Sequence, residues 1–160
     1  MKQQELAKTL QIKPITVLLA EDNVSFRKSV KALIETDEDI DVVGEAKNGR
    51  EAVELALDLQ PEVVVMDIAM PVLNGLQAAH QIRGKSSSIR VIMLSAHPDP
   101  EYIEQAFKCG AFGYLIKQSA PQDLIRAIRR VQKGKTFFSA SIPKGLRDQW
   151  LKASAKRSYC

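Results

Sequence analysis

Five polar side chains stand where short apolar runs of the sequence end, and their types suit phosphoryl-transfer chemistry. In chain order they are Glu21 and Asp22 after residues 15–20, Asp67 after 63–66, Ser95 after 91–94 and Lys117 after 114–116. A charged group at the tip of a buried strand is costly to place there unless it is paired or binds an ion. Because parallel strands end together at one edge of their sheet, we expect these groups to converge.

Three carboxylates at one edge repel one another when all are ionised, so such a cluster either raises a pKa or binds a cation. Glu21, Asp22 and Asp67 offer only oxygen ligands, which suit a hard ion such as Mg²⁺ or Mn²⁺. A carboxylate beside such an ion can attack a phosphoryl group and form an acyl phosphate. Lys117 would supply positive charge to the transferred oxygens and Ser95 a hydrogen bond. Any one of these residues alone is more often a polar strand end that faces water, so the interpretation depends on their convergence.

Short apolar strands alternate five times with amphipathic helical patterns. The strand candidates are residues 15–20, 40–43, 63–66, 89–94 and 112–116. Capping residues Asn48, Asp99 and Ser119 mark the starts of three helices, and Gly110 marks the end of one; a further helix is expected over about residues 76–83. The alternation predicts an α/β fold with a parallel sheet covered by helices on both faces.

The length of 160 residues predicts one domain with short tails. We divide the chain into an N-terminal leader (1–13), a domain (14–134), and a connector with a short basic tail or helix (135–160). Residues 14–140 carry 15 Lys and Arg against 17 Asp and Glu, so the formal charge of +4 comes from the tails. It is therefore poor evidence for nucleic-acid binding. In the last segment Leu146, Trp150 and Leu151 form an apolar stripe at helical spacing, which is expected to pack on the domain or on a partner.

No apolar run approaches membrane-spanning length, and the N-terminus lacks the apolar region of a signal peptide. A cytoplasmic protein that does not insert into a membrane is expected. The two cysteines, Cys109 and Cys160, are too few for a disulfide framework and have no metal-ligand spacing. Cys109 falls on the apolar side of a predicted helix and is expected to be a packed thiol.

Four successive motifs, LLAEDN, VVVMDIAMPVLNG, VIMLSAH and GAFGYLIK, resemble the signatures of the bacterial response-regulator receiver domain. The resemblance covers about residues 14–134, and the stretch KQSAPQDLIRAI with the connector TFFSASI is similar to the NarL/FixJ branch. It implies a phosphoprotein of two-component or phosphorelay signal transduction. The implied fold is a flavodoxin-like, doubly wound five-stranded parallel sheet of order 2-1-3-4-5.

The resemblance implies that a sensor histidine kinase or phosphotransfer protein phosphorylates Asp67. It assigns Mg²⁺ (or Mn²⁺) to Glu21, Asp22, Asp67 and the backbone carbonyl of Ala69. It assigns the phosphoryl group to Lys117 and Ser95, a switch role to Ser95 and Tyr114, and an influence on phosphoryl lifetime to Ala69 and His97. No enzymatic activity is expected beyond accepting the phosphoryl group and losing it by slow autodephosphorylation.

The sequence departs from the family pattern at three places. Glu21 replaces the more usual Asp, and Gln118 follows Lys117 where many members have Pro, so a cis bond there is not expected. After the connector only residues 141–160 remain, too few for a helix-turn-helix domain, and Pro143 is expected to interrupt any helix. We therefore expect a module that acts through a downstream protein or as a homodimer, without direct specific DNA binding. The alternative is the receiver part of a truncated NarL/FixJ-type transcription factor that lost its DNA-binding domain.

Other classes of protein fit the motifs less well. Haloacid dehalogenase-type phosphatases need a second Asp two residues after the nucleophile, where this chain has Ala69. Neither a Walker A loop nor a G-x-G-x-x-G turn follows any strand, which argues against nucleotide binding. For the signalling module, an output surface is expected over Tyr102, Phe107, Tyr114 and the last helix.

Overall fold

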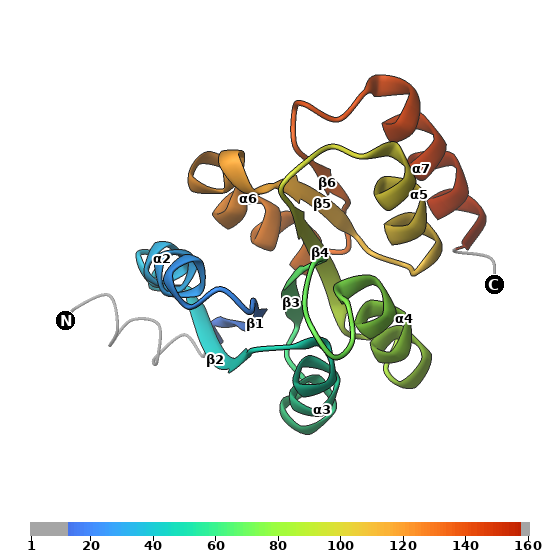
Figure 1. The fold of residues 1–160 in the computed structure, drawn as a ribbon. Helices are drawn as coiled ribbons and strands as arrows, with labels where there is room; N and C mark the ends of the chain where they lie inside the picture. Colours follow the sequence, from blue (N-terminus) through green and yellow to red (C-terminus); the bar gives the residue numbers. More distant parts are fainter. Residues whose placement is uncertain (1–12, 158–160) are drawn as a thin grey trace.

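The computed structural model describes residues 13–157, and a six-stranded parallel sheet of order β2-β1-β3-β4-β5-β6 forms its centre (Figure 1). The strands are β1 (Ile15–Ala20), β2 (Ile40–Ala46), β3 (Val63–Asp67), β4 (Arg90–Ser95), β5 (Gly113–Ile116) and β6 (Phe137–Phe138). The helices are α2 (Val24–Glu35), α3 (Gly49–Leu59), α4 (Gly75–Lys85), α5 (Pro100–Lys108), α6 (Ala120–Gln132) and α7 (Lys144–Arg157), with a short 3₁₀ turn η1 (Lys117–Ser119).

Helices cover both faces of the sheet, and the core therefore has two halves. Helices α2 and α6 cover one face, and α3, α4 and α5 cover the other (Figure 1). Successive strand residues point to opposite faces, so Leu18 packs in one half of the core while Val17 and Leu19 pack in the other. A strand buried on both sides has no polar face, which explains the unbroken apolar runs.

Most of the helix starts expected from the sequence carry the predicted caps. The side chains of Asn48 and Asp99 accept hydrogen bonds from the backbone N–H groups of Glu51 and Glu101, each at 2.9 Å. Ser119 is the N-cap residue of α6, at the helix start that the sequence predicted, but its side chain does not cap the helix. Its hydroxyl donates to the carbonyl of Ile116 at 2.9 Å and makes no capping bond to α6.

The connector after residue 134 contains a sixth strand, where the sequence predicted five strands. Phe137 and Phe138 pair in parallel with Gly113 and Tyr114 of β5, and Phe137 is buried. Two residues are too short a run for a periodic pattern to show, so only the pairing with β5 reveals this strand. The flavodoxin-like order of the other strands agrees with the prediction.

The last helix is longer than the sequence indicated, because Pro143 precedes it instead of interrupting it. The carbonyl of Pro143 accepts hydrogen bonds from the N–H groups of Leu146 and Arg147, both at 3.1 Å. A proline at the start of a helix loses no hydrogen bond, since the first N–H groups have no partner within the helix. Residues 1–12, most of the predicted leader, and Cys160 lie outside the described residues.

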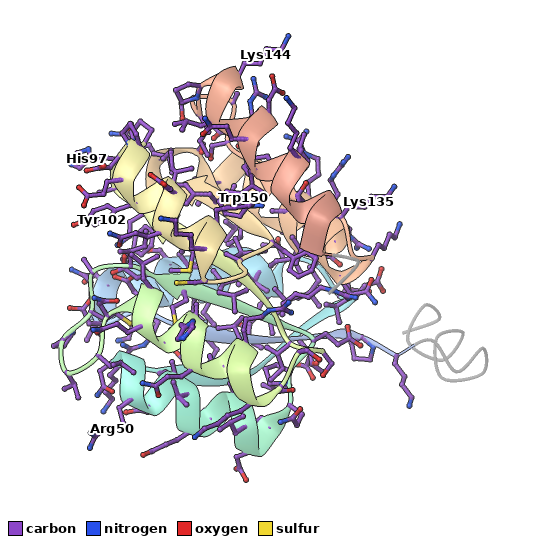
Figure 2. All side chains as sticks on the ribbon, turned by 90° about the vertical axis from the view of Figure 1, so that its right-hand side faces the viewer. Arg50, His97, Tyr102, Lys135, Lys144 and Trp150 are labelled. Atoms are coloured by element: carbon purple, nitrogen blue, oxygen red, sulfur yellow. The ribbon has the colours of Figure 1, made fainter. Side chains whose placement is uncertain are left out.

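Trp150 fixes α7 against the domain. Its ring makes T-shaped contacts with two aromatic rings, Phe107 of α5 at 5.4 Å and Phe138 of β6 at 5.0 Å between centroids. Figure 2 shows Trp150 between α5 and α7. Leu146 packs on the same core, as the apolar stripe predicted, whereas Leu151 is 48% exposed and does not belong to it.

This packing corrects the expected output surface. Phe107 contacts Trp150, Tyr114 is fully buried, and of the three predicted aromatic residues Tyr102 alone is exposed. The sequence pattern showed that an apolar stripe exists but not which surface it covers. Cys109 is half-buried, and burial raises the pKa of its thiol, in agreement with a packed cysteine. Among the described residues no helix is both long and apolar enough to cross a bilayer.

Candidate functional site

The polar residues at the ends of β1, β3 and β5 meet at one edge of the sheet. Lys117 Nζ lies 3.2 Å from Asp67 Oδ2 and 3.3 Å from Glu21 Oε2. Strands β1 and β3 are neighbours, whereas β4 separates β3 from β5. The long side chain of Lys117 therefore crosses the end of β4 to reach both acids.

Glu21, Asp22 and Asp67 form a compact group of carboxylates. One oxygen of each lies within 4.8 Å of the others, while Glu21 and Asp67 are buried and Asp22 is exposed. Three carboxylates held this closely, with only oxygen atoms on offer, fit a hard divalent cation. The exposed Asp22 leaves one side of the group open to water, which such an ion usually keeps as part of its ligand shell.

Burial acts most strongly on Glu21. Loss of solvent, followed by the neighbouring Asp67 carboxylate, raises the pKa of Glu21 to about 7, against the opposing effect of Lys117. The backbone N–H of Asn23 donates to Glu21 Oε1 at 3.3 Å, and Arg27 Nη1 donates to the Glu21 carbonyl at 2.7 Å. These two bonds fix the side chain and the backbone of Glu21. Lys117 carries one positive charge and faces two acids, so it cannot neutralise both.

Phe26 supports Lys117 and was not expected at the site. Lys117 Nζ lies 4.7 Å from the centre of the Phe26 ring, within range of a cation–π contact. Phe26 lies in the first turn of α2 and is partly buried against the half of the core that contains Val17 and Leu19. The overlooked signal was an aromatic residue in the first turn after an acidic pair.

Ser95, Tyr114 and His97 form a separate group at the end of β4. The Ser95 hydroxyl donates to the His97 carbonyl at 2.9 Å, and the Tyr114 hydroxyl reaches the same oxygen at 3.4 Å. Burial, as the main cause, raises the pKa of Tyr114 to about 12. The imidazole of His97 is exposed at the rim (Figure 2). In this arrangement the Ser95 hydroxyl bonds to its own loop and not to Asp67.

The loop after β3 closes around Asp67. The backbone N–H of Ala69 donates to Asp67 Oδ1 at 3.3 Å, and the Ala69 side chain is exposed. Helix α4 starts against this loop, because a Cβ atom on Gly75 would clash with the Asp67 carbonyl oxygen. The absence of a side chain at position 75 therefore allows α4 to approach the end of β3.

This fold and this cluster define the receiver domains of response regulators. The sequence profile described as the response regulator receiver domain matches residues 17–129, and the chain belongs to this family. The four motifs predicted this membership. The stretch KQSAPQDLIRAI with its connector indicated the NarL/FixJ branch, which agrees with the relatives described next.

Two curated relatives illustrate the similarity. The nitrate/nitrite response regulator protein NarL of Escherichia coli (strain K12) is 40% identical over 129 residues, which are 81% of this chain and 60% of that protein. The transcriptional regulatory protein YvfU of Bacillus subtilis (strain 168) is 41% identical over 128 residues, 80% of this chain and 64% of that protein. The chain thus spans less than two thirds of the length of these relatives.

Solved structures show the same fold. The signal receiver domain of a NarL response regulator from Mycobacterium tuberculosis superimposes with a TM-score of 0.74 at 32% identity, covering 77% of this chain and 99% of that chain. A LuxR-family two-component response regulator from Aurantimonas superimposes with a TM-score of 0.80 at 29% identity, covering 87% of this chain and 99% of that chain. The chain contains a receiver domain of the NarL/LuxR type that takes part in two-component signalling.

Proposed function

We propose that Asp67 accepts a phosphoryl group from a sensor histidine kinase or a phosphotransfer protein. The supporting observation is the contact of 3.2 Å between Lys117 Nζ and Asp67 Oδ2 inside a compact group of carboxylates. A buried carboxylate beside a cation and next to a site for a divalent ion is arranged for attack on phosphorus. If Asp67 served only to form an ion pair with Lys117, a second buried acid, Glu21, beside it would not be needed.

The proposed transfer is a simple displacement. A carboxylate oxygen of Asp67 forms a bond to phosphorus while the bond from phosphorus to the histidine nitrogen of the donor breaks. The electron pair stays on that nitrogen, and Asp67 becomes an acyl phosphate. Lys117 stabilises negative charge on the transferred oxygens. Hydrolysis of the acyl phosphate by water is the only turnover proposed.

A divalent cation, Mg²⁺ or Mn²⁺, is part of this proposal. The side chains of Glu21, Asp22 and Asp67 with the backbone carbonyl of Ala69 would hold it, and it would offset charge on the phosphoryl oxygens. Lys117 already pairs with Glu21 and Asp67, so it keeps the cluster partly neutralised when the metal leaves.

Signal output is proposed to start at Ser95. A phosphoryl group adds strong acceptors and about −1.5 to −2 charges at Asp67. The Ser95 hydroxyl then exchanges the His97 carbonyl for a phosphoryl oxygen, which frees the loop that the Tyr114 hydroxyl contacts. The resulting change at α5 alters contacts with a downstream protein or a second copy of the chain. Specific DNA binding is not assigned to residues 14–140, which carry more acidic than basic groups.

Intact-mass analysis tests the acceptor. The protein is incubated with Mg²⁺ and acetyl phosphate, which loses acetate on transfer. We expect one phosphoryl adduct in the wild type and in Asp58→Asn, an aspartate of α3, but none in Asp67→Asn. An unmodified wild type, or an adduct that persists in Asp67→Asn, would contradict the proposal.

A further inference from the structure

Ser139 is a fully buried polar residue in the connector after β6. It lies beyond residue 129, where the match to the receiver family ends. Its backbone N–H donates to the Tyr114 carbonyl at 3.1 Å, and its hydroxyl accepts the backbone N–H of Ile116 at 2.8 Å. A hydroxyl so deeply buried is costly unless it is hydrogen-bonded, so the partners of this hydroxyl define what it holds in place.

The Ser139 hydroxyl belongs to a closed ring of hydrogen bonds. Its oxygen lies 3.0 Å from the Ser119 hydroxyl oxygen, which in turn lies 2.9 Å from the Ile116 carbonyl. A carbonyl only accepts, so Ser119 donates to Ile116, and the proton between the two serines comes from Ser139. Both hydroxyl protons and both backbone groups of Ile116 are therefore satisfied by this one ring.

The ring joins the two ends of the turn that carries Lys117. Ile116 precedes Lys117, and Ser119 ends the 3₁₀ turn that Lys117 begins. Residue 118 is glutamine, so no proline ring fixes the backbone of this turn. The backbone N–H of Ala120 donates to the Lys117 carbonyl, and the side-chain hydrogen bonds of the ring add to this single backbone bond. From this turn the Lys117 side chain extends to Asp67 and Glu21. A shift at Ile116 or Ser119 would move the amino group away from both acids.

We propose that Ser139 is a positioning residue for phosphoryl transfer, which holds Lys117 against Asp67 through Ile116 and Ser119. Ser139 touches neither Asp67 nor the phosphoryl group, so it is not a catalytic residue. The inference depends on the proposed function, since it assigns to Ser139 a part in the same transfer. It also places a determinant of the site in the connector, beyond the residues that the receiver-domain profile matches.

A purely structural role for Ser139 makes a different prediction. If the hydroxyl only stabilised β6 and the connector, its loss would lower stability without depending on Lys117. If it acts through Lys117, its loss has no further effect once the amino group is gone. A double-mutant comparison separates the two roles.

The experiment measures the phosphorylation rate of Asp67 by acetyl phosphate in the full chain at saturating Mg²⁺. Ser139→Ala should slow the transfer about tenfold or more, which is the effect of 1.36 kcal/mol on a barrier. Ser141→Ala, an exposed serine of the same connector, should match the wild type. Ser119→Ala breaks the same ring from a half-buried position, so it should show a similar loss and be non-additive with Ser139→Ala.

Two further measurements complete the test. In a Lys117→Ala background, Ser139→Ala should leave the residual rate unchanged. Mg²⁺ affinity, measured by calorimetry without a phosphodonor, should not fall in Ser139→Ala, because the cation ligands lie on other strands and the amino group that moves away from them is itself positively charged. A lower affinity would mean that the carboxylates themselves had moved, which would overturn a role through Lys117.

The outcomes distinguish the two proposals. A wild type that accepts no phosphoryl group would overturn the proposed function itself. A phosphorylated wild type, with Ser139→Ala and Ser119→Ala as fast as Ser141→Ala, would overturn the positioning role alone. An equal slowing by Ser139→Ala with and without Lys117 would also overturn it, since the effect would then not pass through the lysine.

Discussion

Lys117 connects acids that lie far apart in the sequence. It contacts Glu21 at the end of β1 and Asp67 at the end of β3, and it rests on the ring of Phe26 in α2. Buried pairs of this kind are weak evidence for stability, because the charges lose solvent on burial. Their close arrangement is better explained by chemistry at Asp67.

Glu21 allows a prediction about pH. Its pKa in the folded protein is about 7, above the ordinary value of 4.5, so the folded state binds a proton more tightly than the unfolded state. Without metal, the free energy of unfolding should therefore fall as the pH rises from about 4.5 to about 7. Glu21→Gln removes this group, and the variant should gain about 1–3 kcal/mol relative to wild type between pH 5 and pH 8.

Urea unfolding with a chelator at both pH values measures the difference. Glu54→Gln, an exposed glutamate of α3, serves as the control and should follow the wild type. Added Mg²⁺ should raise the stability of the wild type at pH 8, because a cation held by the three clustered carboxylates would bind the folded state alone. If the free energy of unfolding depended on pH identically in wild type and Glu21→Gln, the raised pKa of Glu21 would be contradicted.

At the scale of elements, the connector and α7 are part of the domain. Strand β6 extends the sheet, Ser139 bonds to Ile116, and Trp150 packs between α5 and β6. From its sequence this segment was expected to be a connector and a short tail or helix, with an apolar stripe that packs on the domain or on a partner. Leu146 and Trp150 of that stripe do pack on the domain, whereas Leu151 does not. Most of the segment's contacts are with residues more than twenty positions away in the sequence. No local sequence pattern reveals such partners.

Trp150→Ala tests the docking of α7. Removal of a buried tryptophan ring should cost about 3–5 kcal/mol, since it deletes apolar contacts and leaves a cavity. Leu151→Ala, the exposed neighbour on the same helix, should change stability by no more than about 0.5 kcal/mol. Unfolding in urea, followed by circular dichroism, gives both values. Similar small effects of the two changes would mean that α7 does not depend on Trp150.

At the scale of the whole molecule, the site and α7 are linked through β5 and β6. Tyr114 lies beside the Ser95–His97 bond, pairs with Phe138 in the sheet, and Phe138 contacts Trp150. A change at Ser95 can therefore reach α7 through packed neighbours. Spatial continuity alone does not prove coupling, which has to be measured.

Hydrogen exchange with and without a phosphoryl mimic measures this coupling. With Mg²⁺ and beryllofluoride, amide exchange should change in residues 95–103 and 138–150, because Ser95 leaves the His97 carbonyl and α5 carries Phe107. Helix α3, on the far side of α4, should exchange as before and serves as the internal control (Figure 1). Changes confined to the loop after Asp67 would contradict a link to α7.

The sequence by itself determined the α/β alternation and the meeting of Asp67, Glu21 and Lys117. Ser95, which was expected beside them, instead bonds within its own loop. Apolar runs define the strands, and strands that run parallel must end together, so the order of the motifs was enough to place Asp67, Glu21 and Lys117 at one edge. This inference needs only local patterns and one rule of sheet geometry.

The tertiary structure alone decided how those residues are held. The support of Phe26 under Lys117, the hydroxyl ring through Ser139 and the covering of Phe107 by Trp150 all join distant segments. Hydrogen bonds and aromatic contacts of this kind depend on side-chain directions and on where loops cross, and neither leaves a periodic trace in the sequence. The sheet edge was predictable because its geometry repeats along the chain, whereas the supports of Lys117 were not because each occurs only once.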